Sequence, residues 1–97
     1  MLDRTETIQK LSSFKQQLGD RFGIQRLGIF GSVARNENTD QSDIDIVVEI
    51  DNPSLSGMYE LRNSLKSLFG CEVDLIRYRD TLRPLFKSNI NRDAIYV

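Results

Sequence analysis

The chain has 97 residues, of which 39% are hydrophobic and 28% charged, and its formal net charge is −1. This composition is typical of one small domain, and no apolar run approaches the roughly 20 residues of a membrane span. Histidine is absent and Cys71 is the only cysteine, which excludes histidine catalysis, an internal disulfide and histidine or cysteine-rich metal sites. Any bound metal therefore needs oxygen ligands, which favours Mg²⁺ or Mn²⁺.

The N-terminal residues and the charge distribution of the chain lead to two expectations. Residues 1–6 lack the basic-then-apolar pattern of a secretion signal, so we expect a cytoplasmic protein that does not associate with membranes. Residues 36–61 hold seven acidic side chains and no lysine or arginine. Such a segment repels a polyphosphate unless cations are bound to it.

The N-terminal third predicts a helix, a strand and a turn suited to phosphate. Residues 4–18 carry apolar side chains at helical spacing, with Gly19 as the expected end of the helix. Residues 24–30 predict a strand that enters the Gly31-Ser32 turn. A strand that leads through glycine into a helix N-terminus directs backbone N–H groups outward, and the Ser32 hydroxyl adds a donor.

The next strand carries two aspartates on one face. Residues 33–36 predict a short helix, residues 38–42 a polar connection and residues 43–50 a strand. Successive strand side chains point to opposite faces, so Asp43 and Asp45 share a face and lie within reach of a common cation. The opposite, apolar face consists of Ile44, Ile46, Val48 and Ile50.

A second long helix follows. Ser54 or Ser56 is the expected N-cap, Phe69 the approximate end and Gly70 the closing residue. The apolar positions repeat at intervals of three and four residues: Leu55, Met58, Leu61, Leu65 and Leu68.

The C-terminal part predicts a strand, a helix and a short extended piece. Residues 71–76 form the strand, with Asp74 on the face opposite its apolar neighbours. Pro84 suits the first turn of a helix over residues 85–90, and residues 94–97 are apolar enough to pack against the body. The alternation of helices and strands predicts one α/β layer structure.

Three aspartates and the turn supply complementary chemistry. Polymerase-type sites hold two metal ions roughly 3.5–4 Å apart against the reacting phosphate. Asp43 and Asp45 are candidates to bridge both ions, and Asp74 to complete the ion that holds the nucleophile and to help remove its proton. A Gly-Ser pair alone is usually a turn and an Asp-x-Asp alone is usually a solvated face, but the combination in this order is specific.

Two further residues have competing interpretations. Arg35 either steers phosphates or forms a salt bridge with Glu37. Ser42 either contacts the nucleotide or caps its loop. Cys71 is interpreted as a small strand residue rather than a catalytic thiol.

The combined pattern resembles a known superfamily, the DNA polymerase β-like nucleotidyltransferases, and within it the minimal, stand-alone MNT (MntA-type) proteins. The resemblance extends over nearly the whole chain and rests on Gly31-Ser32-x-Ala34-Arg35, Ser42-Asp43-x-Asp45, Asp74 and the ending over residues 93–97. It implies a small mixed β-sheet flanked by helices, in one nucleotidyltransferase domain over residues 1–97. Asn36 stands where minimal members often have glycine, and asparagine tolerates the positive φ expected there.

The resemblance also implies roles for individual residues. Gly31 and Ser32 match the triphosphate-binding turn, and Asp43, Asp45 and Asp74 match the three metal-binding carboxylates.

The function that the resemblance implies is protein adenylylation. ATP is the substrate, two Mg²⁺ or Mn²⁺ ions are the cofactors, and the acceptor is a tyrosine hydroxyl of a HEPN-type RNase toxin. The chain then acts as the antitoxin of a type VII-like pair, and no direct DNA binding is expected. Two alternatives stay open: a non-catalytic antitoxin that neutralises its partner by covering it, and a nucleotidyltransferase for small hydroxyl compounds that resembles the aminoglycoside-modifying enzymes.

Overall fold

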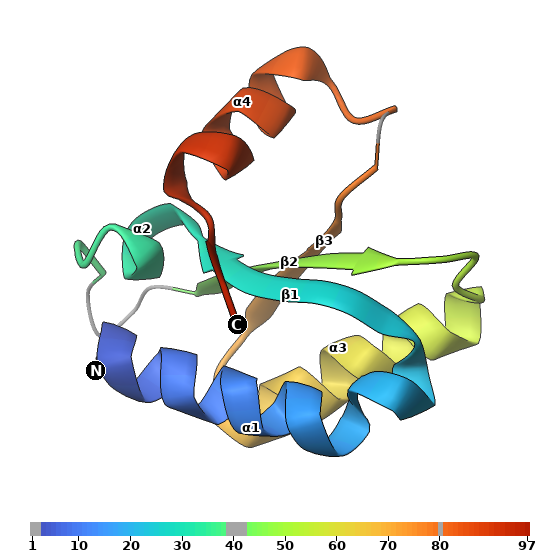
Figure 1. Ribbon diagram of the computed structural model, residues 1–97. Helices are drawn as coiled ribbons and strands as arrows, with labels where there is room; N and C mark the ends of the chain where they lie inside the picture. Colours follow the sequence, from blue (N-terminus) through green and yellow to red (C-terminus); the bar gives the residue numbers. More distant parts are fainter. Residues whose placement is uncertain (1–2, 39–42, 80) are drawn as a thin grey trace.

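The computed structural model describes residues 3–38, 43–79 and 81–97. A sheet with strand order β3-β2-β1-β4 forms its centre. Helices α1 and α3 cover one face of the sheet, and α4 stands over the other (Figure 1). In chain order the elements are α1 (Arg4–Phe22), β1 (Ile24–Phe30), α2 (Gly31–Ala34), β2 (Ile44–Ile50), α3 (Leu55–Phe69), β3 (Val73–Arg77), α4 (Pro84–Asp93) and β4 (Ile95–Tyr96). The predicted small mixed sheet flanked by helices is confirmed.

The strand pairing brings distant parts of the sequence together. Strand β1 pairs antiparallel with both β2 and β4, whereas β2 and β3 run parallel because α3 connects them as a crossover. In this register Asp45 lies opposite Phe30 on one side and beside Asp74 on the other. The C-terminal end of β1 and the N-terminal ends of β2 and β3 therefore meet at one edge of the sheet.

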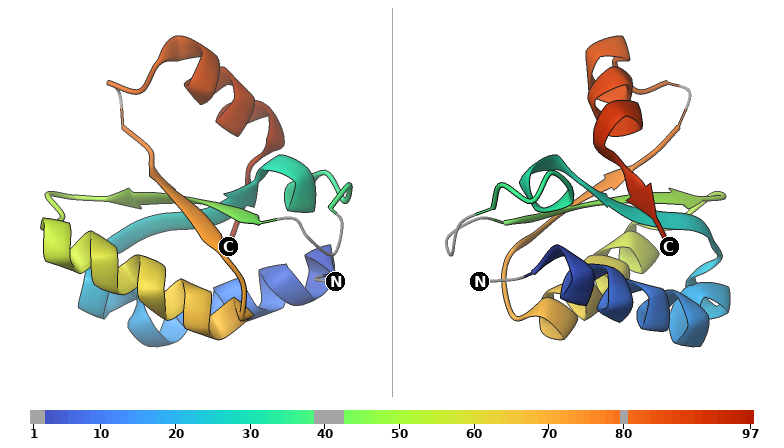
Figure 2. Two further views of the ribbon diagram at one scale, coloured as in Figure 1. Left: turned by 180° about the vertical axis from the view of Figure 1, so that it is seen from behind. Right: turned by 60° about the vertical axis from the view of Figure 1, so that its left-hand side comes forward.

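The two faces of the sheet have separate apolar clusters. The apolar face predicted for β2 is confirmed, since its four residues pack with Leu11, Leu61 and Leu65 beneath α1 and α3. On the opposite face, Phe30 and Val47 pack with Ile90 of α4. Figure 2 shows from behind and from the side how α4 rises away from this second face. The face beneath α4 is thus the only one not covered by long helices in the part of the chain that the structure describes.

Local signals set most helix ends. Ser54 caps α3, since its hydroxyl accepts a hydrogen bond from the Gly57 N–H at 2.9 Å, and Gly70 ends the helix with φ +67°. Pro84 begins α4 as expected. The prediction of Gly19 as the end of α1 is wrong: the helix continues to Phe22, and Gly23 provides the left-handed cap.

Two other details differ from the sequence prediction. Leu55 belongs to the apolar stripe but is 92% exposed at the first residue of α3. Helix α2 begins at Gly31 instead of Val33. The predicted C-terminal extended piece that packs against the body is confirmed, because Ile95–Tyr96 form the short strand β4 on β1. Among the described residues, no helix is both long and apolar enough to span a membrane.

Gly28→Ala should detach β4 from the sheet. A Cβ at Gly28 would lie 2.6 Å from the Ile95 carbonyl oxygen and 2.9 Å from Cδ1 of Tyr96. We expect a loss of about 2 kcal/mol in the free energy of unfolding, measured by urea denaturation. Gly19→Ala is the control, because its Cβ meets only Cγ of Lys15 at 3.5 Å and alanine favours a helix by up to about 1 kcal/mol. Equal stability of Gly28→Ala and the wild type would contradict this account of β4.

Candidate active site

Two of the predicted carboxylates lie side by side on neighbouring strands. Asp45 of β2 and Asp74 of β3 are paired in the parallel register, so their side chains point to the same face. This is the face of α4, because the flanking residues Ile44, Ile46 and Val73 point to the other side. Asp43 directly precedes β2 and is exposed like Asp74, whereas Asp45 is half-buried. The structure thus brings the three aspartates of the sequence pattern to one edge of the sheet.

Negative charge accumulates at Asp45. Burial raises the pKa of Asp45 above its ordinary value, and the charges of Asp74 and Asp43 raise it further. The positive charge of Arg35 acts in the opposite direction but is the smallest of the four contributions. A bound cation would relieve this repulsion.

The Gly31 turn lies directly against the carboxylate of Asp45. Gly31 has φ +70°, a conformation that other residues adopt only with strain. A Cβ at this position would overlap Oδ2 of Asp45 and lie 3.0 Å from its Cγ. The glycine is therefore needed for the contact between turn and carboxylate, in addition to the ligand access expected from the sequence.

Helix α2 presents the N–H groups of its first turn at this contact, and these have no partners within the helix. Its other end is closed by backbone hydrogen bonds from Arg35 N–H to the Gly31 oxygen (3.1 Å) and from Glu37 N–H to the Ser32 oxygen (2.8 Å). Asn36 has φ +60°, so the positive φ expected at this position is confirmed. A donor-rich turn and an acidic strand end are thus in contact.

The donor set fits magnesium or manganese by its chemistry. Within residues 3–38, 43–79 and 81–97, no three acidic or cysteine side chains converge closely enough to form a ready metal site. The candidate ligands Asp43, Asp45 and Asp74 offer only carboxylate oxygens, which Mg²⁺ prefers, and their mutual repulsion favours a cation. Because Asp43 and Asp74 are exposed, their side chains have room to turn toward a shared ion.

Arg35 forms ion pairs in the structure. Its Nε lies 3.1 Å from Oε2 of Glu37, the alternative considered from the sequence, and its Nη1 lies 2.7 Å from Oδ2 of Asp93. A role of Arg35 in phosphate binding stays a prediction, as do the roles of Gly31 and Ser32. Ser42 lies outside the described residues. Sequence reasoning noted Asp93 only as part of the ending over residues 93–97 and missed its pairing with Arg35, because no local pattern links a residue at the end of α4 to one that follows α2.

Asp45→Asn should stabilise the metal-free protein. The substitution removes a half-buried charge that is repelled by Asp74 and Asp43. We expect a gain of about 1 kcal/mol, or roughly 4–8 °C in Tm for a domain of this size, measured in EDTA. Asp51→Asn is the control, since Asp51 is exposed and accepts a hydrogen bond from Gln25 at the far end of β2. A lower Tm for Asp45→Asn would contradict the claim that burial and the charges of Asp74 and Asp43 destabilise the Asp45 carboxylate.

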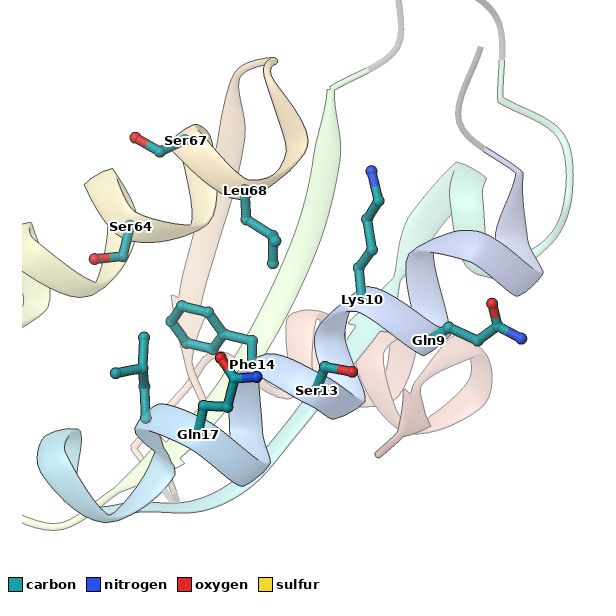
Figure 3. Close-up of a pocket in the computed structure, with 9 residues that line it drawn as sticks. Gln9, Lys10, Ser13, Phe14, Gln17, Ser64, Ser67 and Leu68 are labelled. Atoms are coloured by element: carbon teal, nitrogen blue, oxygen red, sulfur yellow. The ribbon is translucent and has the colours of Figure 1, made fainter.

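A hollow of about 720 Å³ lies elsewhere, between α1 and α3. In Figure 3 the polar groups of Ser64 and Ser67 point away from the centre of the hollow, while Phe14 and Leu68 lie between the helices. This hollow is on the face of the sheet opposite to Asp45 and Asp74. It contains none of the candidate catalytic residues.

Comparisons with known proteins agree with this geometry. The family described as "Nucleotidyltransferase domain" matches residues 11–97. A candidate protein adenylyltransferase of Methanocaldococcus jannaschii, MJ1379, is 40% identical over 96 residues, which is 96% of each chain. The protein adenylyltransferase MntA of Thermococcus cleftensis is 36% identical over 98 residues, or 100% of this chain and 98% of the relative.

Solved structures share the fold. A structure described as a candidate minimal nucleotidyltransferase is 29% identical, with a TM-score of 0.81 over 97% of this chain and 95% of that one. A chain from the complex of the tri-AMPylated Shewanella oneidensis HEPN toxin with its MNT antitoxin is 21% identical, with a TM-score of 0.67 over 93% of this chain and 70% of that one. With a family match from residue 11 to residue 97 and relatives of 36–40% identity along nearly its whole length, this chain belongs to the nucleotidyltransferase domain family, in its minimal, MntA-type group.

Proposed function

We propose that this chain transfers AMP from ATP to a tyrosine hydroxyl of a HEPN-type RNase toxin and thereby acts as its antitoxin. The proposal includes dependence on Mg²⁺ or Mn²⁺ and treats residues 1–97 as one catalytic domain. The observation that carries it is the contact between the Gly31 turn and Asp45, with Asp74 beside Asp45 in register. A phosphate-binding turn and metal-binding carboxylates must be adjacent for nucleotidyl transfer.

The candidate site residues have separate roles in one displacement step. The acceptor oxygen forms a bond to the α-phosphorus of ATP, the bond from that phosphorus to the bridging oxygen of the β-phosphate breaks, and pyrophosphate leaves. N–H groups of the Gly31-Ser32 turn hold the triphosphate. Asp74 orients the acceptor hydroxyl and receives its proton, either directly or through water.

The metal ions would be held by Asp43, Asp45 and Asp74. When bound, they supply charge neutralisation for the triphosphate and for the reacting oxygens. Without them, the acidic strand end repels ATP. Burial and the charges of Asp74 and Asp43 raise the pKa of Asp45, and a bound cation would stabilise the ionised carboxylate, which supports a metal-dependent site.

Support for the partner comes from two relatives. One is the protein adenylyltransferase MntA, which is 36% identical to this chain. The other is a chain with the same fold, from the complex of a tri-AMPylated HEPN toxin with its MNT antitoxin. Asp43 and Asp74 are exposed, so a protein segment can reach their carboxylates from solvent.

The test is intact-mass spectrometry of a HEPN-type protein encoded beside this chain, after incubation with the chain, ATP and Mg²⁺. We expect a mass gain of one or more AMP units on a tyrosine, located by peptide mapping and absent in EDTA. An unmodified partner in a stable complex would instead indicate a non-catalytic antitoxin. If the chain neither modifies nor binds the partner, modification of an aminoglycoside or another small hydroxyl compound becomes the better explanation.

A further inference from the structure

We infer that Asp93 is a positioning residue, whose carboxylate holds the Gly31-Ser32 turn in place through Arg35. The inference rests on the proposed function, in which that turn binds the triphosphate. It assigns to the end of α4 a role in nucleotide affinity that neither the sequence pattern nor the comparisons assign. The first observation is that the Asp93 side chain is only 7% exposed, although its residue lies at a helix end.

Two arginines hold the carboxylate of Asp93. Nη1 of Arg35 donates to Oδ2 at 2.7 Å, and Nε of Arg92 donates to Oδ1 at 3.0 Å. Hydrogen bonds from Arg92 and Arg35 lower the pKa of Asp93 despite its burial. The carboxylate is therefore charged at neutral pH and forms a charge-assisted link between α4 and the residue that follows α2.

The link continues from Arg35 into the turn. The backbone N–H of Arg35 donates to the carbonyl oxygen of Gly31 at 3.1 Å, so the residue that Asp93 holds is bonded directly to the first residue of α2. Nη1 of Arg4 in α1 donates to the Ala34 oxygen at 3.2 Å from the other side. A helix of only four residues is not stable on its own, and these side chains from α1 and α4 supply its support.

The position of α4 is itself fixed by packing. The rings of Phe86 and Phe30 meet edge to face with their centroids 6.5 Å apart, and Ile90 is buried against Phe30 and Val47. Phe30 directly precedes Gly31, so α4 contacts the residues that flank α2, Phe30 on one side and Arg35 on the other. Asp93 lies at the end of this rigid element, which is the placement that a positioning group requires.

The experiment compares nucleotide affinity and turn order in Asp93→Ala, Asp93→Glu and the wild type. We expect Asp93→Ala to raise the Kd for a non-hydrolysable ATP analogue with Mg²⁺, and the KM for ATP, about tenfold, with kcat changed less than twofold. Hydrogen exchange of the amides of residues 32–37 should accelerate, while exchange in β2 stays unchanged. Asp93→Glu should restore most of the affinity.

The matched control is Glu49→Gln, which removes a carboxylate paired with Arg26 at 3.5 Å and remote from the turn. Its Kd should equal that of the wild type. A double-mutant cycle of Asp93→Ala with Arg35→Ala should be non-additive, because both variants break the same link. Additive effects, or unchanged affinity and exchange in Asp93→Ala, would overturn the inference.

Failure of the inference is distinguishable from failure of the proposed function. If the wild type binds the ATP analogue but modifies no partner, the proposed function fails, and the affinity and exchange data still decide the role of Asp93. If the wild type modifies its partner and Asp93→Ala has wild-type KM, only the role of Asp93 fails. If the wild type binds no nucleotide, both are overturned.

Discussion

Asp45→Asn should reduce adenylyl transfer about 100- to 1000-fold while leaving the complex with the proposed HEPN-type partner intact. Asp45 lies between Asp74 and the Gly31 turn, so its carboxylate is placed to hold metal ions beside the triphosphate that the turn is proposed to bind. Asparagine keeps the shape of the side chain and removes its charge. The measurement is the initial rate of AMP incorporation into the partner, together with the Kd of the complex.

The stability of the same variant separates a catalytic from a structural effect. Because metal-free Asp45→Asn is expected to be more stable than the wild type, a loss of activity with a higher Tm excludes misfolding as its cause. Asp51→Asn removes the same charge from the same acidic segment and should retain wild-type activity. Wild-type activity of Asp45→Asn would show that the cluster of Asp43, Asp45 and Asp74 is not the catalytic centre.

Gly31→Ala should reduce kcat/KM for adenylyl transfer about 100-fold. The new Cβ would overlap the Asp45 carboxylate, so either the turn or the carboxylate must move, and a displacement of about 1 Å at a reacting centre has consequences of this size. The measurement is kcat/KM for ATP with the partner protein in excess.

Gly23→Ala is the matched control for backbone strain. Gly23 has φ +72°, close to the +70° of Gly31, but a Cβ there has no atom within 4 Å. Both variants should lose about 1–2 kcal/mol of stability from the left-handed conformation, whereas only Gly31→Ala should lose activity. Equal activity of the two variants would refute the contact between turn and carboxylate as a functional feature.

Much of the fold was predictable because its signals are local. The alternation of Asp43, Ile44, Asp45 and Ile46 indicated which face of β2 is buried, and Ser54 and Gly70 marked the ends of α3. These features depend on side-chain periodicity and backbone preferences within a few residues. Gly19 misled the prediction because a buried glycine inside a helix looks, in sequence, like a helix end.

The remaining features depend on contacts between distant segments. The register that sets Asp45 beside Asp74 follows from the parallel pairing of β2 and β3 across α3. The pair of Arg35 with Asp93 joins residues 58 positions apart. The sequence supports a salt bridge of Arg35 to Glu37 because the two residues are close along the chain, but it contains no signal that pairs Arg35 with Asp93.

The most direct test of the central claim is transfer of label from ATP radiolabelled at either its α- or its γ-phosphate to the HEPN-type partner. Nucleotidyl transfer at the Asp45 cluster predicts that label from the α-phosphate appears on the partner and that label from the γ-phosphate appears only in pyrophosphate. Asp45→Asn should reduce the rate of both about 100- to 1000-fold. Label on the partner from the γ-phosphate, or α-phosphate transfer that persists undiminished in Asp45→Asn, would contradict the account.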